Sequence, residues 1–309
     1  MSEAAAPSPA TPASALFSIA VVERDTGIGK DTLRVWERRY GFPQPLRDEH
    51  GERLYPAEQV ERLRRIRRLM DLGMRPGKIF AASDSELDSL LQASDSAGAA
   101  TEAGHELLDL VRLAHSEALR VSLQQRLMKQ GLERFVTDTL APLNVAVGNA
   151  WMRGSIEVAD EHLYTEHVQN LLRAAIAQRT AVEGAPRILL TTLPEEPHGL
   201  GLLMAEALLV SEGAQCVSLG TRTPLADILS AVDSGQFDVL ALSFSAAFPQ
   251  RLASSGLQQL SASLPEHVEI WAGGRGLGPR MPAFPRVRIL GEIASVLQVL
   301  ADWRSRQAH

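Results

Sequence analysis

Residues 187–211 decide the fold of the C-terminal part of this 309-residue chain, and their sequence is RILLTTLPEEPHGLGLLMAEALLVS. The compact apolar run at 187–193 predicts a buried strand, and residues 199–211 predict a helix. Further strands are expected at 215–219, 238–245, 268–272 and 287–290, with helical stretches at 225–232 and 292–304. Strands that alternate with helices at this spacing are typical of a parallel, doubly wound sheet. We therefore expect a Rossmann-like α/β domain over residues 185–309.

The turn between that first strand and its helix is a candidate ligand site. Open α/β sheets bind ligands at the carboxyl ends of their strands. Here His198 can ligate a metal through one ring nitrogen while Glu196 accepts a hydrogen bond from the other. Gly199 and Gly201 would let a bulky group approach the start of the helix. Taken alone, an ordinary turn with a surface histidine is the more common outcome of such a pattern.

Upstream of the sheet, the composition changes three times. Residues 1–16 are rich in alanine, proline and serine and are expected to be a disordered tail. Residues 17–82 are charged and rich in arginine, and the small, polar residues 83–104 predict a linker. From 105 to 184 apolar residues recur at helical spacing with little glycine or proline, which predicts a four-helix bundle. Two or three domains are also the natural expectation for this length.

The charges are unevenly distributed along the chain. The net charge is −6, yet residues 17–80 hold fourteen Lys/Arg and ten Asp/Glu, so the remainder carries −10. This distribution predicts that only the N-terminal part binds a polyanion. The single cysteine, Cys216, fits a reducing compartment, and the longest apolar runs are too short to span a bilayer. We therefore expect a cytoplasmic protein with no membrane partner.

The N-terminal part contains a candidate DNA-recognition helix. Over residues 32–40, Leu33, Trp36 and Tyr40 would face inward, which leaves four side chains to face outward toward a major groove: Thr32, Arg34, Arg38 and Arg39. The following segment, bounded by glycine and proline, suits a wing hairpin that would place Arg47, Arg53 and Tyr55 near the phosphate backbone. By composition alone, a solvated charged helix is an equal alternative.

The whole string from Phe17 to Phe80 resembles the MerR-family DNA-binding domain. The resemblance rests on the helix pattern Thr-Leu-Arg-x-Trp-Glu-Arg-Arg-Tyr-Gly and the wing pattern Gly-x-Arg-x-Tyr. It implies a winged helix-turn-helix that binds double-stranded operator DNA.

Residues 196–201 resemble the cobalamin-binding signature Asp-x-His-x-x-Gly, with Glu196 in place of aspartate. Forty-one residues separate Gly201 from Ser243-Phe244-Ser245, and twenty-seven more precede Gly273-Gly274, as that family expects. The resemblance implies that His198 is the lower cobalt ligand and displaces the nucleotide base of the cofactor. The base tail would then lie against Ser243, Gly273 and Gly274. Ser245 replaces the usual leucine of the second motif.

A third pattern lies in the helical region, where nine residues separate Trp151 from Glu161-His162. This resembles the light-responsive, adenosylcobalamin-binding repressors of the CarH/LitR type, and with the other motifs the resemblance covers nearly the whole chain from Phe17. It implies a helical cap over the upper face of the corrin and a tetramer that binds DNA in the dark. In those repressors a histidine follows the tryptophan and captures cobalt after photolysis, whereas here Met152, a poor ligand for oxidised cobalt, follows. His162 and His167 remain alternatives.

Two other functions compete with a light-responsive, adenosylcobalamin-controlled repressor. One is the cobalamin subunit of a mutase or methyltransferase, but the chain has no room for a substrate barrel, and that function leaves residues 17–80 unexplained. The other is a regulator that has lost its cofactor and uses the sheet domain for protein contacts. We expect a regulator rather than an enzyme.

Overall fold

The computed structural model describes residues 15–71, 74, 76–95, 102–152, 154–179, 184–278 and 281–307. The chain divides into two compact units, one up to Asp95 and one from Ser96 onward. Most of the predicted tail, residues 1–14, lies outside the described residues, and Leu16 begins the first strand. Within the described residues, no helix combines the length and apolar character that a membrane span requires.

Unit 1 is a winged helix-turn-helix, as the sequence predicts. Its elements are β1 (Leu16–Ser18), α1 (Ile19–Thr26), α2 (Lys30–Tyr40), β2 (Leu46–Arg47), β3 (Arg53–Pro56), α3 (Ala57–Asp71), α4 (Pro76–Phe80) and α5 (Asp84–Asp95). The turn between α1 and α2 contains Gly27, whose φ of 66° is readily adopted only by glycine. Strands β2 and β3 pair antiparallel to form the wing, and β1 pairs with the other edge of β3. Leu33 and Trp36 anchor α2 in the core of the unit.

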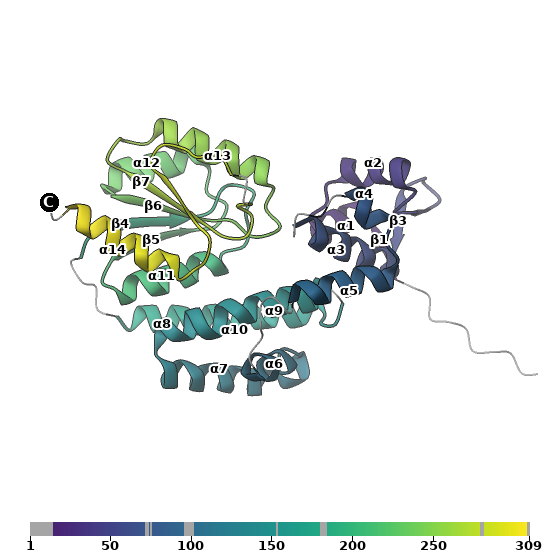
Figure 1. Ribbon diagram of the computed structural model, residues 1–309, viewed down its shortest axis with the longest axis horizontal. Coiled ribbons are helices and arrows are strands. Elements are labelled where there is room, and N and C mark those ends of the chain that lie inside the picture. The colour runs from purple at the N-terminus through teal and green to yellow at the C-terminus, as the bar shows by residue number, and fades with distance from the viewer. Residues whose placement is uncertain are drawn as a thin grey trace, which may run out of the picture. The chain divides into compact units, whose positions relative to one another are not determined.

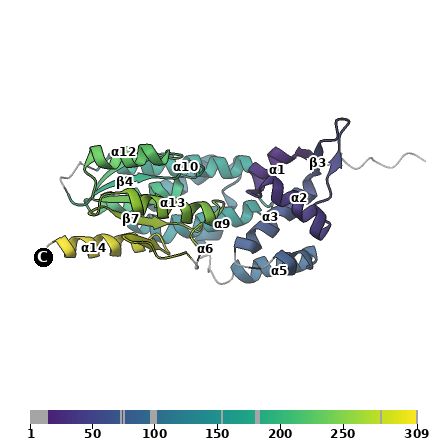
Figure 2. The ribbon, with the colours of Figure 1, turned by 90° about the horizontal axis from the view of Figure 1, so that it is seen from above.

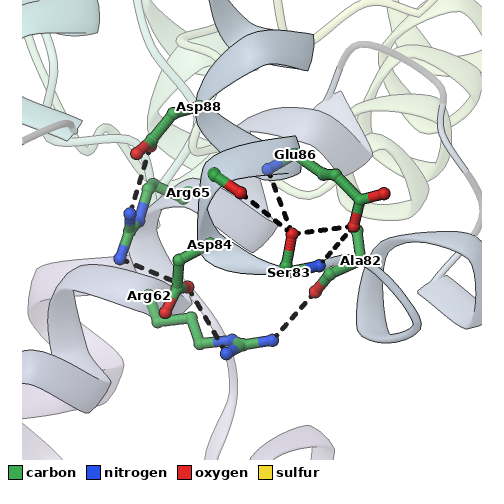
Figure 3. Close-up of polar contacts among 8 residues, drawn as sticks. Arg62, Arg65, Ala82, Ser83, Asp84, Glu86 and Asp88 are labelled. Carbon is green, nitrogen blue, oxygen red and sulfur yellow. Dashed lines mark hydrogen bonds and ion pairs between the residues drawn. The ribbon is translucent and has the colours of Figure 1, made fainter.

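The prediction of a linker over 83–104 is wrong for residues 84–95, which form α5. Ser83 and Glu86 make a capping box: the Glu86 N–H donates to Ser83 Oγ at 3.3 Å, and the Ser83 N–H donates to Glu86 Oε2 at 2.7 Å. Leu87 is fully buried in the core of unit 1. Figure 3 shows how carboxylates of α5 also pair with two arginines of α3, Arg62 and Arg65. The serines that suggest a linker therefore start a helix.

The first part of unit 2 is helical. It contains α6 (Glu102–Asp109), the 3₁₀ turn η1 (Leu113–His115), α7 (Ser116–Gln130), α8 (Leu132–Arg134), the π-helical segment η2 (Phe135–Leu140), α9 (Ala141–Met152) and α10 (Val158–Ala177). Helix α10 begins with a capping box between Glu157 and Asp160. The side chain of Asp160 also accepts a hydrogen bond from the Leu113 N–H at 2.7 Å, which joins the start of α10 to η1.

The second part of unit 2 is the predicted doubly wound sheet. Its elements are β4 (Arg187–Thr191), α11 (Leu200–Ser211), β5 (Gln215–Gly220), α12 (Leu225–Gly235), β6 (Val239–Ser243), α13 (Gln250–Ser263), β7 (Glu269–Gly273), β8 (Val287–Leu290) and α14 (Ser295–Gln307). The five strands are parallel in the order β5-β4-β6-β7-β8. Helix α13 is not among the predicted elements.

Side chains alternate between the two faces of this sheet. Ile188 and Leu190 of β4 point into a core shared with α11 and the helical part, whereas Leu189 points into a second core with α12 and α13. Helix α11 is apolar on nearly all sides because it lies between the sheet and the helical part. Figure 1 shows α11 and α14 on one face of the sheet, and Figure 2 views unit 2 from the other face, with α12 and α13 in front. One continuous core thus extends from Leu107 of α6 to Trp303 of α14.

Candidate cofactor and DNA-binding sites

His198 and Glu196 lie in the turn between β4 and α11, at the carboxyl edge of the sheet. Glu196 Oε1 accepts hydrogen bonds from His198 Nδ1 at 2.7 Å and from the His198 N–H at 3.0 Å. The Nδ1 nitrogen is therefore occupied, and Nε2 is the ring nitrogen left to ligate a metal. The imidazole is 58% exposed, so a ligand can reach it from outside.

Glu196 is buried completely and is held in place by several hydrogen bonds. Its Oε2 accepts a hydrogen bond from the Ser245 N–H at 2.7 Å, and its carbonyl oxygen accepts one from Thr192 Oγ1 at 2.6 Å. Burial alone would raise the pKa of the Glu196 carboxyl, but the hydrogen bonds from His198 and Ser245 outweigh burial and hold the pKa below its usual value. The carboxylate thus stays ionised and keeps its acceptor role toward His198.

A cavity of about 530 Å³ opens at the start of α11, the helix that follows this turn, and we call it the edge pocket. Its sheet side contains residues of all three sequence motifs, and its other side is formed by the start of α9. The lining residues used below are Ala141, Asn144, Val145, Gly201, Met204, Ser243, Gly273, Gly274, Arg275 and Glu292. A volume of this size is within the range of sites that bind a small molecule or cofactor. The spacing of the motifs therefore corresponds to a shared cavity.

The residues around the edge pocket fit the tail of a cobalamin. A Cβ atom on Gly201 would lie 2.8 Å from Ser243 Oγ, so a larger residue at position 201 would collide with Ser243 in the pocket wall. The buried hydroxyl of Ser245 has no hydrogen-bond partner among the described residues. His198 supplies a nitrogen donor that suits cobalt. A single nitrogen ligand beside a largely apolar cavity is the donor set that a cobalt corrinoid with a detached base requires.

The residues predicted to cap the corrin come from neighbouring helix ends. Trp151 lies near the end of α9 and packs, half-buried, against the large core of unit 2. Glu161, in the first turns of α10, accepts a hydrogen bond from Thr165 Oγ1 at 2.8 Å, and its Oε2 lies 3.7 Å from His162 Nε2. His162 is 74% exposed.

Two further residues bear on the ligand that replaces the upper group. Met152 ends α9, but its side chain lies outside the described part of the structure. His167 hydrogen-bonds Ser116 Oγ of α7 at 2.9 Å and lines a small cavity between α7 and α10. In this structure His167 is thus hydrogen-bonded to α7, and its role toward cobalt stays a prediction.

Sequence reasoning missed a polar chain beside the edge pocket. The buried hydroxyl of Tyr164 donates to Asn144 Oδ1, and Asn144 Nδ2 donates to Met204 Sδ at 3.0 Å. Burial raises the pKa of Tyr164, with a smaller contribution from the charge of Glu161. The three residues join α10, α9 and α11. The available signal was the presence of polar Asn144 and Asn149 in a largely apolar α9.

The DNA-contact residues predicted on α2 lie on the exposed face of this helix. Thr32, Arg34, Arg38 and Arg39 are all exposed on that helix, opposite Leu33 and Trp36. The Arg34 guanidinium contacts Asp31 at 3.1 Å, but both side chains are well exposed, so this pair is weak and the arginine can exchange it for a base or phosphate.

The wing residues differ from one another. Arg47 is exposed and donates to the Gly51 carbonyl oxygen at 2.9 Å. Arg53 Nε pairs with Glu37 Oε2 of α2 at 2.9 Å, an interaction that fixes the wing to the recognition helix. Tyr55 is fully buried, and burial raises its pKa, so the prediction that it lies near phosphates is wrong.

Comparison with known proteins finds family matches in both the winged helix-turn-helix unit and the helical part of unit 2. Residues 17–83 match the MerR HTH family regulatory protein, and residues 104–176 match the B12 binding domain. The HTH-type transcriptional repressor CarA of Myxococcus xanthus is 31% identical over 86% of this chain and 88% of CarA. The HTH-type transcriptional repressor CarH of the same organism is 29% identical over 93% of this chain and 96% of CarH. The monomethylamine corrinoid protein of Methanosarcina barkeri shares the fold of 64% of this chain, with a TM-score of 0.52, 13% identity and 96% of that structure covered.

The winged helix-turn-helix and the B12-binding domain together define a DNA-binding transcription regulator of the MerR class that carries a domain for binding cobalamin. This chain belongs to the family of HTH-type transcriptional repressors that includes CarA and CarH. Since these relatives are repressors, the chain is a regulator and not an enzyme.

Proposed function

We propose that the chain is a light-responsive repressor whose oligomeric state, and hence DNA occupancy, is controlled by adenosylcobalamin. The observation that carries the proposal is the presentation of His198: the buried Glu196 carboxylate holds Nδ1, and Nε2 is left for cobalt beside a cavity lined by the remaining motif residues. Residues 17–95 would bind DNA, residues 105–184 would cap the cofactor, and residues 185–309 would hold its lower face. A regulator that binds chromosomal DNA would work in the cytoplasm.

The lower face would be held by His198, with Glu196 fixing the tautomer of the imidazole. The detached nucleotide tail would enter the edge pocket past Gly201 and lie against Ser243, Gly273 and Gly274. Ser245 would keep Glu196 in place through its backbone N–H, and its buried hydroxyl, which has no partner among the described residues, would hydrogen-bond the ligand.

The upper face would be covered by Trp151, Glu161 and His162. Adenosylcobalamin supplies a cobalt–carbon bond that green or blue light cleaves. The chain's own part is to hold Trp151 against the adenosyl group and so keep α9 and α10 in one arrangement. Loss of that contact would shift the two helices, and a tetramer assembled in the dark would dissociate and release DNA.

Size-exclusion chromatography before and after illumination tests this proposal. With adenosylcobalamin in the dark we expect a tetramer that retards operator DNA, and after green light a smaller species that does not. The His198→Ala variant is the matched control, because it should stay small in both conditions while unit 1 remains folded. An elution volume that light leaves unchanged in the loaded wild-type protein would rule out the light switch.

Met152 distinguishes this chain from the pattern of the light-responsive repressors. Because a thioether is a weak ligand for oxidised cobalt, we propose that photolysis leaves no stable bis-histidine adduct. The Met152→His variant should then give a different photoproduct absorbance spectrum from the wild-type protein. Identical spectra would contradict this role for position 152.

A further inference from the structure

Arg275 lies at the edge pocket and directly follows the Gly273-Gly274 motif. It is exposed, it lines the pocket, and it forms no ion pair with any described residue. Most of the pocket wall is apolar, formed by residues such as Ala141, Val145 and Met204. A cation that forms no ion pair with the described residues and lies beside an apolar cavity is a favourable site for a ligand whose body is apolar and which carries one anionic group.

The backbone around Arg275 is fixed by close contact between two loops. The Phe244 N–H donates to the Gly273 carbonyl oxygen at 2.9 Å, and the Gly276 N–H donates to the Phe244 carbonyl oxygen at 3.1 Å. A Cβ on Gly274, which has a φ of +112°, would lie 2.1 Å from the Phe244 oxygen. A Cβ on Gly276 would lie 2.4 Å from the Ser245 oxygen.

Both neighbours of Arg275 must therefore be glycine for the two loops to approach each other this closely. As a consequence, the Cα of Arg275 has a fixed position at the pocket. Less conformational freedom is then lost when the arginine binds a ligand.

We propose that Arg275 is a specificity-determining residue that pairs with the phosphodiester in the nucleotide tail of the corrinoid. This rests on the proposed cobalamin site. The tail combines an aromatic base, which suits the apolar wall, with a single phosphodiester, which suits an arginine. Glu292 also lines the pocket and repels an anion, so the phosphate binds on the Arg275 side. The chain thereby selects complete cobalamins over corrinoids that lack the tail.

Binding of hydroxocobalamin and of cobinamide, which lacks the nucleotide tail, tests the proposal in the full-length protein. Absorbance titration gives the two dissociation constants. We expect Arg275→Gln to weaken hydroxocobalamin binding about 5- to 20-fold and to leave cobinamide binding unchanged, as suits one charge-assisted contact at an exposed site. Arg275→Lys should recover most of the lost affinity. The loss caused by Arg275→Gln should shrink as salt rises, since salt screens an exposed pair.

Arg251, an exposed arginine of α13 that does not line the pocket, gives the matched control: Arg251→Gln should change neither constant. Equal weakening of both ligands, or of neither, by Arg275→Gln would overturn the assignment. Failure of lysine to rescue, together with a salt-independent loss, would show that the arginine contacts the base and not the phosphate, which also overturns it. If the wild-type protein binds neither corrinoid, the proposed cofactor site itself fails, an outcome distinct from a defect limited to the variant.

Discussion

Replacing Glu196 by glutamine is the sharpest test of how the chain presents its histidine. The carboxylate accepts three hydrogen bonds, from His198 Nδ1, the His198 N–H and the Ser245 N–H, at 2.7, 3.0 and 2.7 Å. Glutamine has the same shape but only one oxygen. Whichever way the amide is turned, its NH₂ group must face at least one of these backbone donors.

The two orientations of the amide predict two losses. If the oxygen keeps His198, the buried Ser245 N–H loses its acceptor, which costs about 1–3 kcal/mol of stability. If the amide is turned, its NH₂ donates to Nδ1, and the imidazole proton moves to Nε2, the atom needed for cobalt. Loss of such an orienting partner lowers metal affinity about 10- to 100-fold. We therefore expect Glu196→Gln to lose both stability and cobalamin affinity.

Thermal unfolding and a cobalamin titration followed by absorbance measure the two effects. Glu195→Gln is the matched control, because Glu195 is the exposed neighbour and should change neither quantity. A Glu196→Gln protein that binds hydroxocobalamin as tightly as the wild type, with the same spectrum, would refute the role of Glu196 in orienting His198.

Four further expectations follow from the same structure. Because its folded pKa is lowered, Glu196 contributes stability that is complete above the usual pKa of 4.5 and is lost as pH falls through the lower folded value; the stability difference between wild type and Glu196→Gln should therefore shrink only in acid. Leu87→Ala should destabilise unit 1 by about 2–5 kcal/mol in denaturant unfolding, whereas a true linker residue would show no change. Arg38→Ala should relax sequence choice at a cost of about 1–3 kcal/mol in operator binding. Arg53→Ala should weaken operator and random DNA alike, because it detaches the wing from Glu37, and a loss confined to the operator would contradict this.

The five strands could be predicted from the sequence because each is a short apolar run beside a turn, but α13 could not. The buried residues of this helix are Ala253, Gly256, Leu257, Leu260 and Ser261, which do have helical spacing. Three of the five are small, so the apolar signal is weak. The small size has a packing reason: a Cβ on Gly256 would lie 2.4 Å from Leu193 Cδ1.

The buried position of Tyr55 could have been predicted from the alternation of side chains along a strand. Side chains two residues apart on a strand share a face, so Arg53 and Tyr55 of β3 point the same way. That face meets α2, where Glu37 pairs with Arg53, and the apolar ring of Tyr55 lies in the core. By contrast, no pattern in the sequence shows that Asn144 and Tyr164 are joined, since twenty positions separate them and their contact depends on how the helices pack.

The core that runs from α6 to α14 determines where the chain can be divided when its domains are fused to other proteins. Truncation near residue 184, where the helical part ends in the sequence and the sheet part begins, would remove the helices that pack on α11. In the isolated sheet part, Leu202, Leu203 and Met204 would then be exposed to solvent. Such a fragment should aggregate, since a contiguous apolar surface of that kind promotes association. The part that can be transferred is instead the whole of unit 2, Ser96–His309, because its helical and sheet parts share one core and can be joined together to a different DNA-binding domain.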